Sequence, residues 1–185
     1  DKKSDNTEIY IVEGESAGGC FSGETCVALA DGRNLSFKEL VEENKQGKEN
    51  FCYTIKSDGT IGIEKIENPR LTKENAEVIR IILDDDKEII CTPDHKFMLR
   101  DGNYKEAKDL EKEDSLMPYH QVVELVQSYN HKIKRIEWLK QKIDVYDIEV
   151  PNTHNFALAL GVFVHNSAKM ARNKENQAIL PLKGK

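Results

Sequence analysis

The stretch that decides the fold is residues 143–167, which read Ile143-Asp-Val-Tyr-Asp-Ile-Glu-Val-Pro-Asn-Thr-His-Asn-Phe-Ala-Leu-Ala-Leu-Gly-Val-Phe-Val-His-Asn-Ser167. Its short apolar or alternating runs are typical of β-strands. These runs are 143–150, 155–160 and 162–164. The last run leads directly into three polar side chains, His165, Asn166 and Ser167. The stretch therefore predicts β structure that ends at a chemically reactive sequence.

The sequence upstream of this stretch repeats the same pattern of short strands separated by turn residues. Further strands are predicted at 9–12, 25–30, 51–55, 61–66, 78–83, 88–91, 96–99 and 133–139. Ser36 followed by Glu39 predicts a capping box and one clear helix, and 107–110 predicts a second, shorter one. Many short strands with one or two short helices indicate a mainly β architecture.

Length and charge limit the classes of function. The chain has 185 residues, which suits one domain with tails, and its net charge of -6 argues against nucleic acid as a partner of the middle segment. The last nineteen residues are basic and would suit a phosphate-bearing partner, although short basic tails are more often only solvated. No apolar run approaches the ~20 residues of a membrane helix, and no secretory signal opens the sequence. We expect a cytoplasmic, monomeric protein with no membrane partner.

The four cysteines show no metal-ligand spacing. They lack a Cys-x-x-Cys pair and a clustered Cys/His set, which argues against zinc, and the missing secretory signal argues against disulfides. Cys26, Cys52 and Cys91 are expected to be small buried hydrophobic residues. The acidic triplet at 84–86 is interpreted as a solvated turn.

Cys20 is the exception, because it lies where a nucleophile could break the preceding peptide bond. Its thiol could attack the carbonyl of Gly19 and convert an amide into a thioester, and Gly19 has no side chain to block the approach. A free thiol has a pKa of about 8.5, so some activation is expected.

The best candidate to assist Cys20 is His95, in the sequence Thr92-Pro93-Asp94-His95 after the strand that ends at Cys91. An imidazole can donate a proton to the Cys20 nitrogen as it becomes an amine. Alone, His95 would be an ordinary loop histidine. Thr92 three residues earlier, together with the two reactive ends, favours the catalytic interpretation, and Asp94 is interpreted as a turn former.

Asn166 supplies the chemistry at the other end. Its side-chain amide can attack its own backbone carbonyl, form a succinimide and release the downstream chain. His165 is adjacent and His154 lies eleven residues upstream of His165, so either could donate or accept the protons. Ser167 offers a hydroxyl that could first accept the acyl group from Cys20. An Asn-Ser pair alone is weak evidence, but a pair at the end of an apolar strand is much more specific.

These motifs, in this order, resemble the intein family over residues 20–166. The resemblance implies a Hint fold, a pseudo-symmetric β horseshoe that brings both ends together. It implies that Thr92 and His95 promote the first acyl shift, that Asp147 tunes Cys20 and couples the steps, and that His154 and His165 assist Asn166. It implies no cofactor or metal for splicing and no nucleic-acid partner, with the flanks as the only substrate. The few residues after Pro118 leave no room for the endonuclease of larger inteins.

The flanks resemble a second family. Residues 12–19 joined to 167–169, together with 177–185, look like the toprim motif of DNA gyrase B. Glu13 would then be a magnesium-associated acid of the spliced host, and magnesium and DNA would concern that host alone. The expected organisation is an upstream flank (1–19), a mini-intein (20–166) and a downstream flank (167–185), with Gly19 and Ser167 joined on splicing.

Two alternatives remain open at this point. One is a domain of the same fold that cleaves without ligating, against which Ser167 and the meaningful joined flanks argue. The other is a nucleic-acid-binding module that uses the basic tail.

Overall fold

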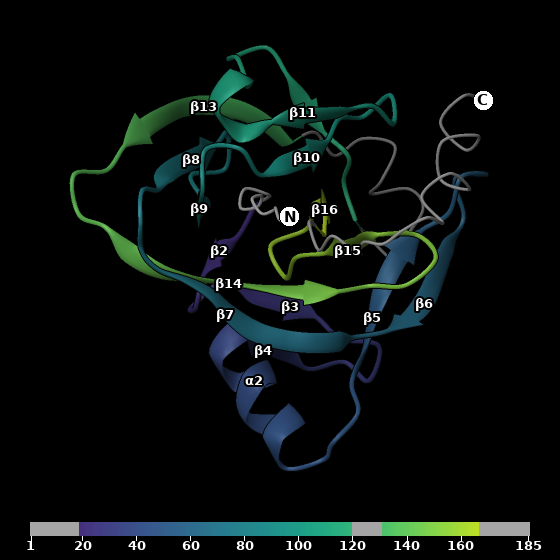
Figure 1. Cartoon of the computed structure of the whole chain (residues 1–185). Coiled ribbons are helices and arrows are strands. Elements are labelled where there is room, and N and C mark those ends of the chain that lie inside the picture. The colour runs from purple at the N-terminus through teal and green to yellow at the C-terminus, as the bar shows by residue number, and fades with distance from the viewer. Residues whose placement is uncertain (1–18, 120–130, 167–185) are drawn as a thin grey trace, which may run out of the picture.

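The computed structural model describes residues 19–119 and 131–166. Within these ranges the protein is mainly β, as predicted (Figure 1). The strands are β2 (Phe21–Ser22), β3 (Cys26–Ala28), β4 (Asn34–Ser36), β5 (Phe51–Ile55), β6 (Ile61–Lys65), β7 (Glu67–Ala76), β8 (Ile79–Leu83), β9 (Glu88–Cys91), β10 (Lys96–Met98), β11 (Tyr104–Glu106), β12 (Ser115–Leu116), β13 (His131–Trp138), β14 (Ile143–Glu149), β15 (Asn155–Ala157) and β16 (Phe163–His165). The helices are α2 (Phe37–Lys45) and the short 3-10 helix η1 (Ala107–Asp109).

Two sheets carry the ends of the predicted 20–166 element. A seven-stranded sheet has the order β12-β13-β8-β9-β2-β14-β7, and a four-stranded sheet has the order β11-β10-β16-β15. In the first sheet, β2 lies between β9 and β14, with Phe21 opposite both Cys91 and Tyr146. In the second, β16 lies between β10 and β15. The start and the end of the element are therefore both central strands.

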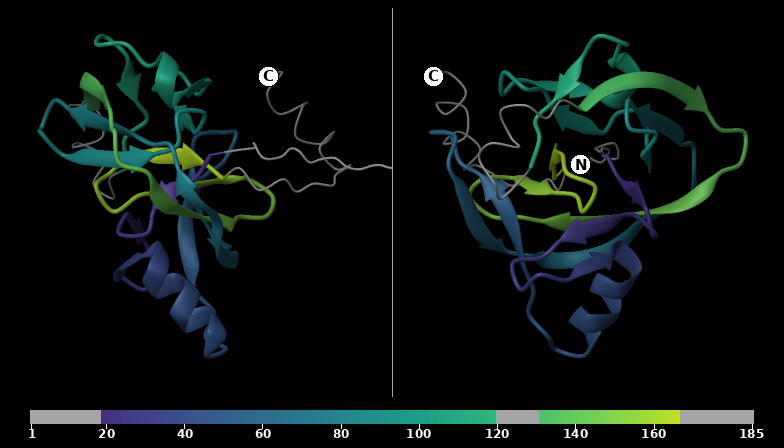
Figure 2. Two further views of the ribbon diagram at one scale, coloured as in Figure 1. Left: turned by 60° about the vertical axis from the view of Figure 1, so that its left-hand side comes forward. Right: turned by 180° about the vertical axis from the view of Figure 1, so that it is seen from behind.

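The long strands β7 and β14 run side by side across the molecule, and α2 lies against them on one side (Figures 1 and 2). The capping box predicted for this helix is confirmed: the Ser36 hydroxyl accepts from the Glu39 N–H, and the Glu39 carboxylate accepts from the Ser36 N–H. Phe37 and Leu40 are the buried residues of the helix. This face of α2 attaches the helix to the sheet.

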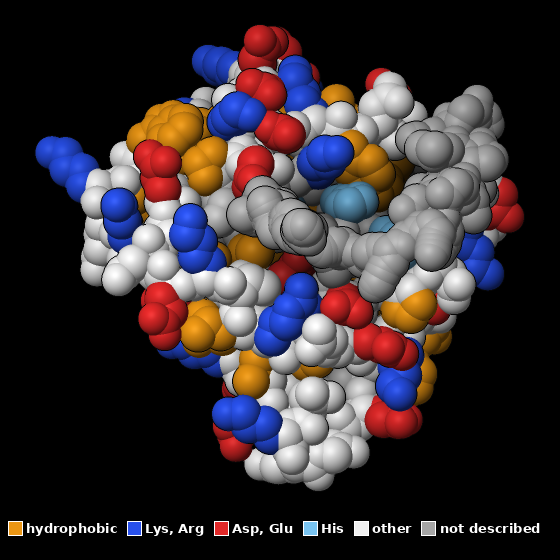
Figure 3. Space-filling model, viewed as in Figure 1, with side chains coloured by type: hydrophobic (Ala, Val, Ile, Leu, Met, Phe, Trp, Pro, Cys, Tyr) orange, Lys and Arg blue, Asp and Glu red, His pale blue; other side chains and the backbone are white. Residues whose placement is uncertain are grey.

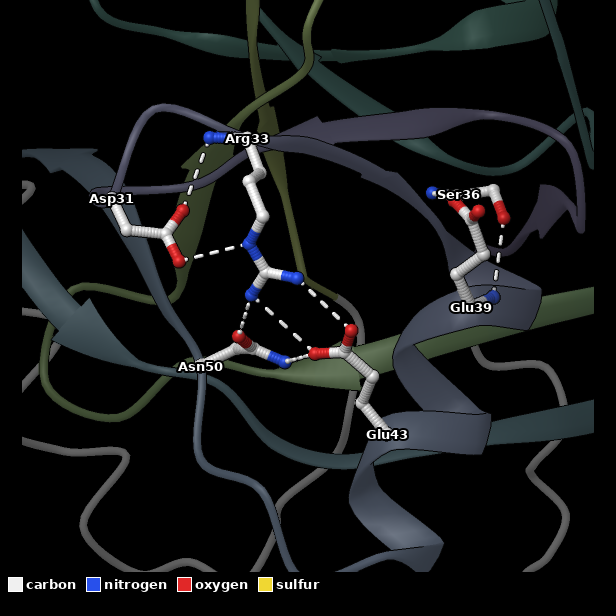
Figure 4. A network of polar contacts seen from close by, with 6 residues as sticks. All are labelled: Asp31, Arg33, Ser36, Glu39, Glu43 and Asn50. Atoms are coloured by element: carbon white, nitrogen blue, oxygen red, sulfur yellow. Dashed lines mark hydrogen bonds and ion pairs between the residues drawn. The ribbon is translucent and has the colours of Figure 1, made fainter.

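Arg33 ties the loop before α2 to its neighbours (Figure 4). Its guanidinium donates to Asp31 at 2.9 Å, to Glu43 on α2 at 2.9 Å, and to Asn50 at 2.7 Å. Asn50 in turn donates to Glu43 at 3.0 Å. The fork geometry of arginine suits such a multiple contact, so Arg33 fixes the loop between β3 and β4 against α2 and the start of β5.

The core is built around four aromatic rings that are fully buried. The Phe21 ring stacks on Phe37 with centroids 5.4 Å apart and meets Phe97 and Phe156 edge to face. These residues come from β2, α2, β10 and β15. The cluster joins the two sheets, and its Phe21 and Phe97 rings contact the predicted catalytic residue His95.

Most predicted elements are confirmed, but the long strand β7 and the short strands β2, β4, β11 and β12 were not predicted. The strand β5 has the predicted bounds, and the hairpins β5–β6 and β8–β9 pair as expected. The 3-10 helix η1 corresponds to the predicted short helix at 107–110. The ten-residue β7 was not predicted, because its polar sequence and Pro69 give no strand signal. None of the helices in the described ranges has the length and apolar character needed to cross a membrane.

Candidate active site

Cys20 precedes β2 and is held by Thr92 through two hydrogen bonds. The Cys20 N–H donates to the Thr92 hydroxyl at 2.9 Å, and the Thr92 N–H donates to the Cys20 carbonyl at 2.9 Å. The first of these involves the nitrogen of the Gly19–Cys20 peptide bond. The structure thus places the predicted helper residue Thr92 on the leaving atom of the predicted first step.

The Cys20 thiol is half-buried and protonated at neutral pH. Burial raises its pKa well above the usual range, and the negative charge of Asp147 raises it further. The Thr72 hydroxyl, 2.9 Å from Cys20 Sγ, and the Arg70 guanidinium act in the opposite direction. Forming a nucleophile at this sulfur therefore requires proton removal that is coupled to the attack.

Gly19 is pressed against His95. A Cβ atom at Gly19 would lie 2.3 Å from His95 Nδ1 and 2.6 Å from His95 Cα, and Gly19 has a φ of +153° that other residues rarely adopt. Only glycine fits this position without displacing the imidazole. The sequence predicted that Gly19 leaves the thiol free access to the carbonyl. The structure adds a second reason for glycine here, which is the space that His95 occupies.

His95 is fully buried among aromatic rings, 4.1 Å from the Phe21 ring and 5.6 Å from Phe97 between centroids. Loss of hydration lowers its pKa to about 4. Backbone groups of Gly19 and His165 favour the charged form, although neither contact reaches full hydrogen-bond geometry. The imidazole is neutral at pH 7 and lies next to the backbone of both ends of the 20–166 element.

Asn166 is 2% exposed and its side chain is anchored at one atom. Its Oδ1 accepts from the Val150 N–H at 3.2 Å, and its backbone N–H donates to the His154 carbonyl at 2.9 Å. Because Oδ1 and Nδ2 belong to one planar amide, the bond to Val150 also fixes the direction of Nδ2, the atom that would attack. His154 has a positive φ of 57°, so its backbone turns sharply where it meets Asn166.

His165 ends β16 and lies opposite Asn155 of β15. Its ring meets Tyr104 of β11 edge to face, with centroids 4.9 Å apart. His154 and His165 are half-buried. Figure 3 shows histidine side chains that reach the surface beside hydrophobic ones, in contrast to the enclosed His95.

Asp147 is fully buried on β14, where its Oδ1 accepts from the Ile148 N–H at 2.8 Å. After burial, its negative charge is the next largest cause of the raised pKa of the Cys20 thiol. Asp94 is more than a turn former: burial raises its pKa, and a hydrogen bond with the Thr92 hydroxyl partly opposes that effect.

The structure therefore brings seven of the predicted residues together around the two ends of the 20–166 element. They are Gly19, Cys20, Thr92, His95, Asp147, His165 and Asn166, with His154 joined through its backbone. Ser167, Glu13, the predicted strand at 9–12 and the flanks lie outside the described residues. Sequence reasoning missed Thr72 and Tyr104, because neither belongs to a motif and only the pairing of the strands brings them to the site.

One group of side chains in the described part of the chain could hold a cation. Asp84, Asp85 and His131 place their ligand atoms within 4.8 Å of one another, with His131 Nδ1 3.8 Å from the Asp85 carboxylate. These residues belong to none of the predicted catalytic motifs. The triplet interpreted as a solvated turn thus has a buried imidazole beside it.

Comparisons with known proteins agree with this geometry. The family model of the intein splicing domain matches residues 27–166. DNA gyrase B of Synechocystis sp. (strain ATCC 27184 / PCC 6803 / Kazusa) is 66% identical over 122 residues, which are 66% of this chain and 11% of that protein. The replication factor C small subunit of Methanocaldococcus jannaschii is 26% identical over 100 residues, 54% of this chain and 5% of that protein. The chain thus spans only a small part of these relatives.

Solved structures show the same fold. The DnaB intein from Synechocystis sp. PCC 6803 has a TM-score of 0.66 at 24% identity, covering 82% of this chain and 100% of that one. The Ssp DnaB mini-intein variant M86 has a TM-score of 0.69 at 23% identity, covering 83% of this chain and 97% of that one. The expected Hint architecture is therefore confirmed.

Proposed function

The chain belongs to the intein splicing domain family, whose members are self-splicing elements, and on that premise we propose that it excises residues 20–166 and joins Gly19 to Ser167. The observation that carries this proposal is the position of His95. Its imidazole touches the Gly19 backbone at one end of the element and lies beside the His165 backbone at the other. One neutral proton carrier can thus serve both ends.

In the first step, Cys20 Sγ attacks the Gly19 carbonyl. The S–H and C–N bonds break, the C–S and N–H bonds form, and the net movement of the proton is from sulfur to the Cys20 nitrogen. Thr92 holds that nitrogen at 2.9 Å, and His95 can take up and deliver the proton because it is neutral. Such general acid–base help contributes roughly 10²–10⁴ in rate.

In the second step, the Ser167 hydroxyl attacks the thioester and releases the Cys20 thiol, which gives a branched oxygen ester. Serine is a weaker nucleophile than a thiolate, so this transfer needs a local base. The role of Ser167 rests on its place directly after Asn166 in the sequence.

In the third step, Asn166 Nδ2 attacks the Asn166 carbonyl and expels the Ser167 nitrogen, which takes up a proton. The hydrogen bond from the Val150 N–H orients the amide. His165 directly precedes Asn166 in the chain, and the His154 carbonyl accepts from the Asn166 N–H. The O-to-N acyl shift that follows makes the Gly19–Ser167 peptide. It runs downhill and needs no catalyst.

The host is proposed from the flanks. Residues 1–19 and 167–185 would be pieces of a DNA gyrase B, in line with the relative from Synechocystis. Magnesium, held in part by Glu13, and DNA would then be bound only by the spliced host. Splicing itself uses only the residues of the chain.

Intact mass spectrometry of the purified chain over time tests the proposal. We expect an excised 20–166 fragment and a joined flank product. Cys20→Ala should stop ligation, and Asn166→Ala should stop release at the downstream end. A wild-type chain that stays intact as long as a Cys20→Ala/Asn166→Ala double variant would refute autocatalysis, and separated flanks without a joined product would indicate cleavage alone.

A further inference from the structure

Thr72 on β7 presents its hydroxyl to the Cys20 sulfur. Thr72 Oγ1 lies 2.9 Å from Cys20 Sγ and 3.0 Å from the Val145 carbonyl oxygen, and it is placed to donate to both. A hydroxyl has one proton, so it cannot serve both acceptors at once. The arrangement of these three groups therefore depends on the state of the sulfur.

The proton positions follow from what each group can do. The Thr72 hydroxyl can donate to either acceptor, but a neutral thiol sulfur is a weak acceptor and the Val145 carbonyl a strong one. With a neutral thiol the Val145 carbonyl is therefore the preferred acceptor, and Thr72 Oγ1 can accept from the Cys20 S–H. A thiolate can only accept. Once the sulfur carries charge, the Thr72 hydroxyl can turn away from Val145 and donate to the sulfur.

The local backbone directs Thr72 to this position. Leu71 and Lys73 of β7 lie opposite the adjacent residues Tyr146 and Val145 of β14, so Thr72 is an extra residue in a β-bulge. Bulges occur next to active sites, where they redirect a side chain. Here the bulge turns the Thr72 hydroxyl toward the start of β2.

We propose that Thr72 is a further catalytic residue of the first step, whose hydroxyl switches from the Val145 carbonyl to the Cys20 sulfur as that sulfur becomes the nucleophile. The inference rests on the proposed function, because it needs Cys20 to be the attacking residue. Thr72 transfers no proton; it keeps its own and changes acceptor. The thiol proton still ends on the Cys20 nitrogen as the C–S bond forms and the C–N bond breaks.

The charges around Cys20 make such a neutral donor useful. Asp147 on β14 and Asp94 in the turn after β9 both oppose a negative sulfur, and Arg70 on β7 favours it. Burial opposes the charge more strongly than any of these groups. A hydrogen bond to a charged acceptor in such a site is worth roughly twice a neutral one.

The test uses Thr72→Val, which keeps the shape and removes the hydroxyl, and Thr72→Ser, which keeps the hydroxyl. Both are made in an Asn166→Ala background, so that only the upstream step is read. Upstream cleavage by an added thiol is measured from pH 6 to pH 10 by intact mass. Thr60→Val, which removes a hydroxyl bonded to Asp58 in the exposed β5–β6 turn, is the matched control.

We expect Thr72→Val to slow cleavage by about tenfold at each pH, as expected for the loss of one hydrogen bond to a charged group. Thr72→Ser should stay within about threefold of the parent rate because it keeps the hydroxyl beside Cys20. Thr60→Val should do the same because it leaves Thr72 and its neighbours unchanged. If the Thr72→Val chain does not fold, Thr72→Ala, which also lacks the hydroxyl, replaces it and should show the same slowing.

An unchanged rate in Thr72→Val, or an equally slow rate in Thr72→Ser, would overturn the role of Thr72. Failure of the proposed function would look different. In that case Cys20→Ala would cleave as fast as the parent, whatever stands at Thr72.

Discussion

Acid should destabilise this fold through His95. The folded state holds this histidine at a pKa of about 4, below its ordinary value of 6.5, because it is fully buried. As the pH falls below 6.5, the unfolded chain binds a proton at His95 and the folded chain does not. Stability that is fully present above the unfolded pKa is therefore lost as the pH falls toward the folded one.

The size of the effect follows from the shift. One pKa unit corresponds to about 1.4 kcal/mol, so His95 should cost the fold about 2 kcal/mol at pH 5 relative to pH 7.5. The loss should approach about 3 kcal/mol near pH 4. Either value is a large share of the ~5–15 kcal/mol that stabilises a typical domain.

Guanidinium denaturation of an inert Cys20→Ala/Asn166→Ala chain measures the loss, with and without His95→Gln. Other groups titrate equally in both chains, so the difference between their pH dependences isolates His95. The glutamine chain should lose about 2 kcal/mol less between pH 7.5 and pH 5. The same loss in both chains would refute the inference that the folded state excludes the proton from His95.

Three further predictions concern the same centre. Gly19→Ala places a Cβ 2.3 Å from His95 Nδ1, so upstream cleavage read by intact mass should slow roughly a hundredfold; a parent-like rate would contradict the close approach. Phe21→Ala should lower the free energy of unfolding by about 3–5 kcal/mol and move the pKa of His95 back toward its usual range, measured by denaturation and by NMR titration of the imidazole. Ser167→Cys should still ligate, because a thiol is the stronger nucleophile; loss of the joined product in a folded chain would exclude the proposed acyl transfer.

The fold was predictable where the signals are local. The capping box at Ser36 and Glu39 marks α2, and Asp58-Gly59 marks the turn between β5 and β6. The strand β7 carries no such signal, because it is polar and contains Pro69. Its pairing with β14 makes it a strand, and that pairing is a tertiary effect that propensity does not contain.

The site was predictable as a set of residue types and only partly as an arrangement. Cys20, His95 and Asn166 are identified by what their side chains can do next to a peptide bond. Thr72 could not be identified in this way, because its hydroxyl reaches Cys20 only through a bulge in β7. The depressed pKa of His95 likewise depends on a cage of aromatic rings drawn from distant segments.

Fragment-ion sequencing of the small product from the incubated wild-type chain tests the central claim most directly. We expect one peptide in which Gly18-Gly19 is followed without a break by Ser167-Ala168. Two separate peptides, one ending at Gly19 and the other beginning at Ser167, would contradict the claim that the chain ligates its flanks.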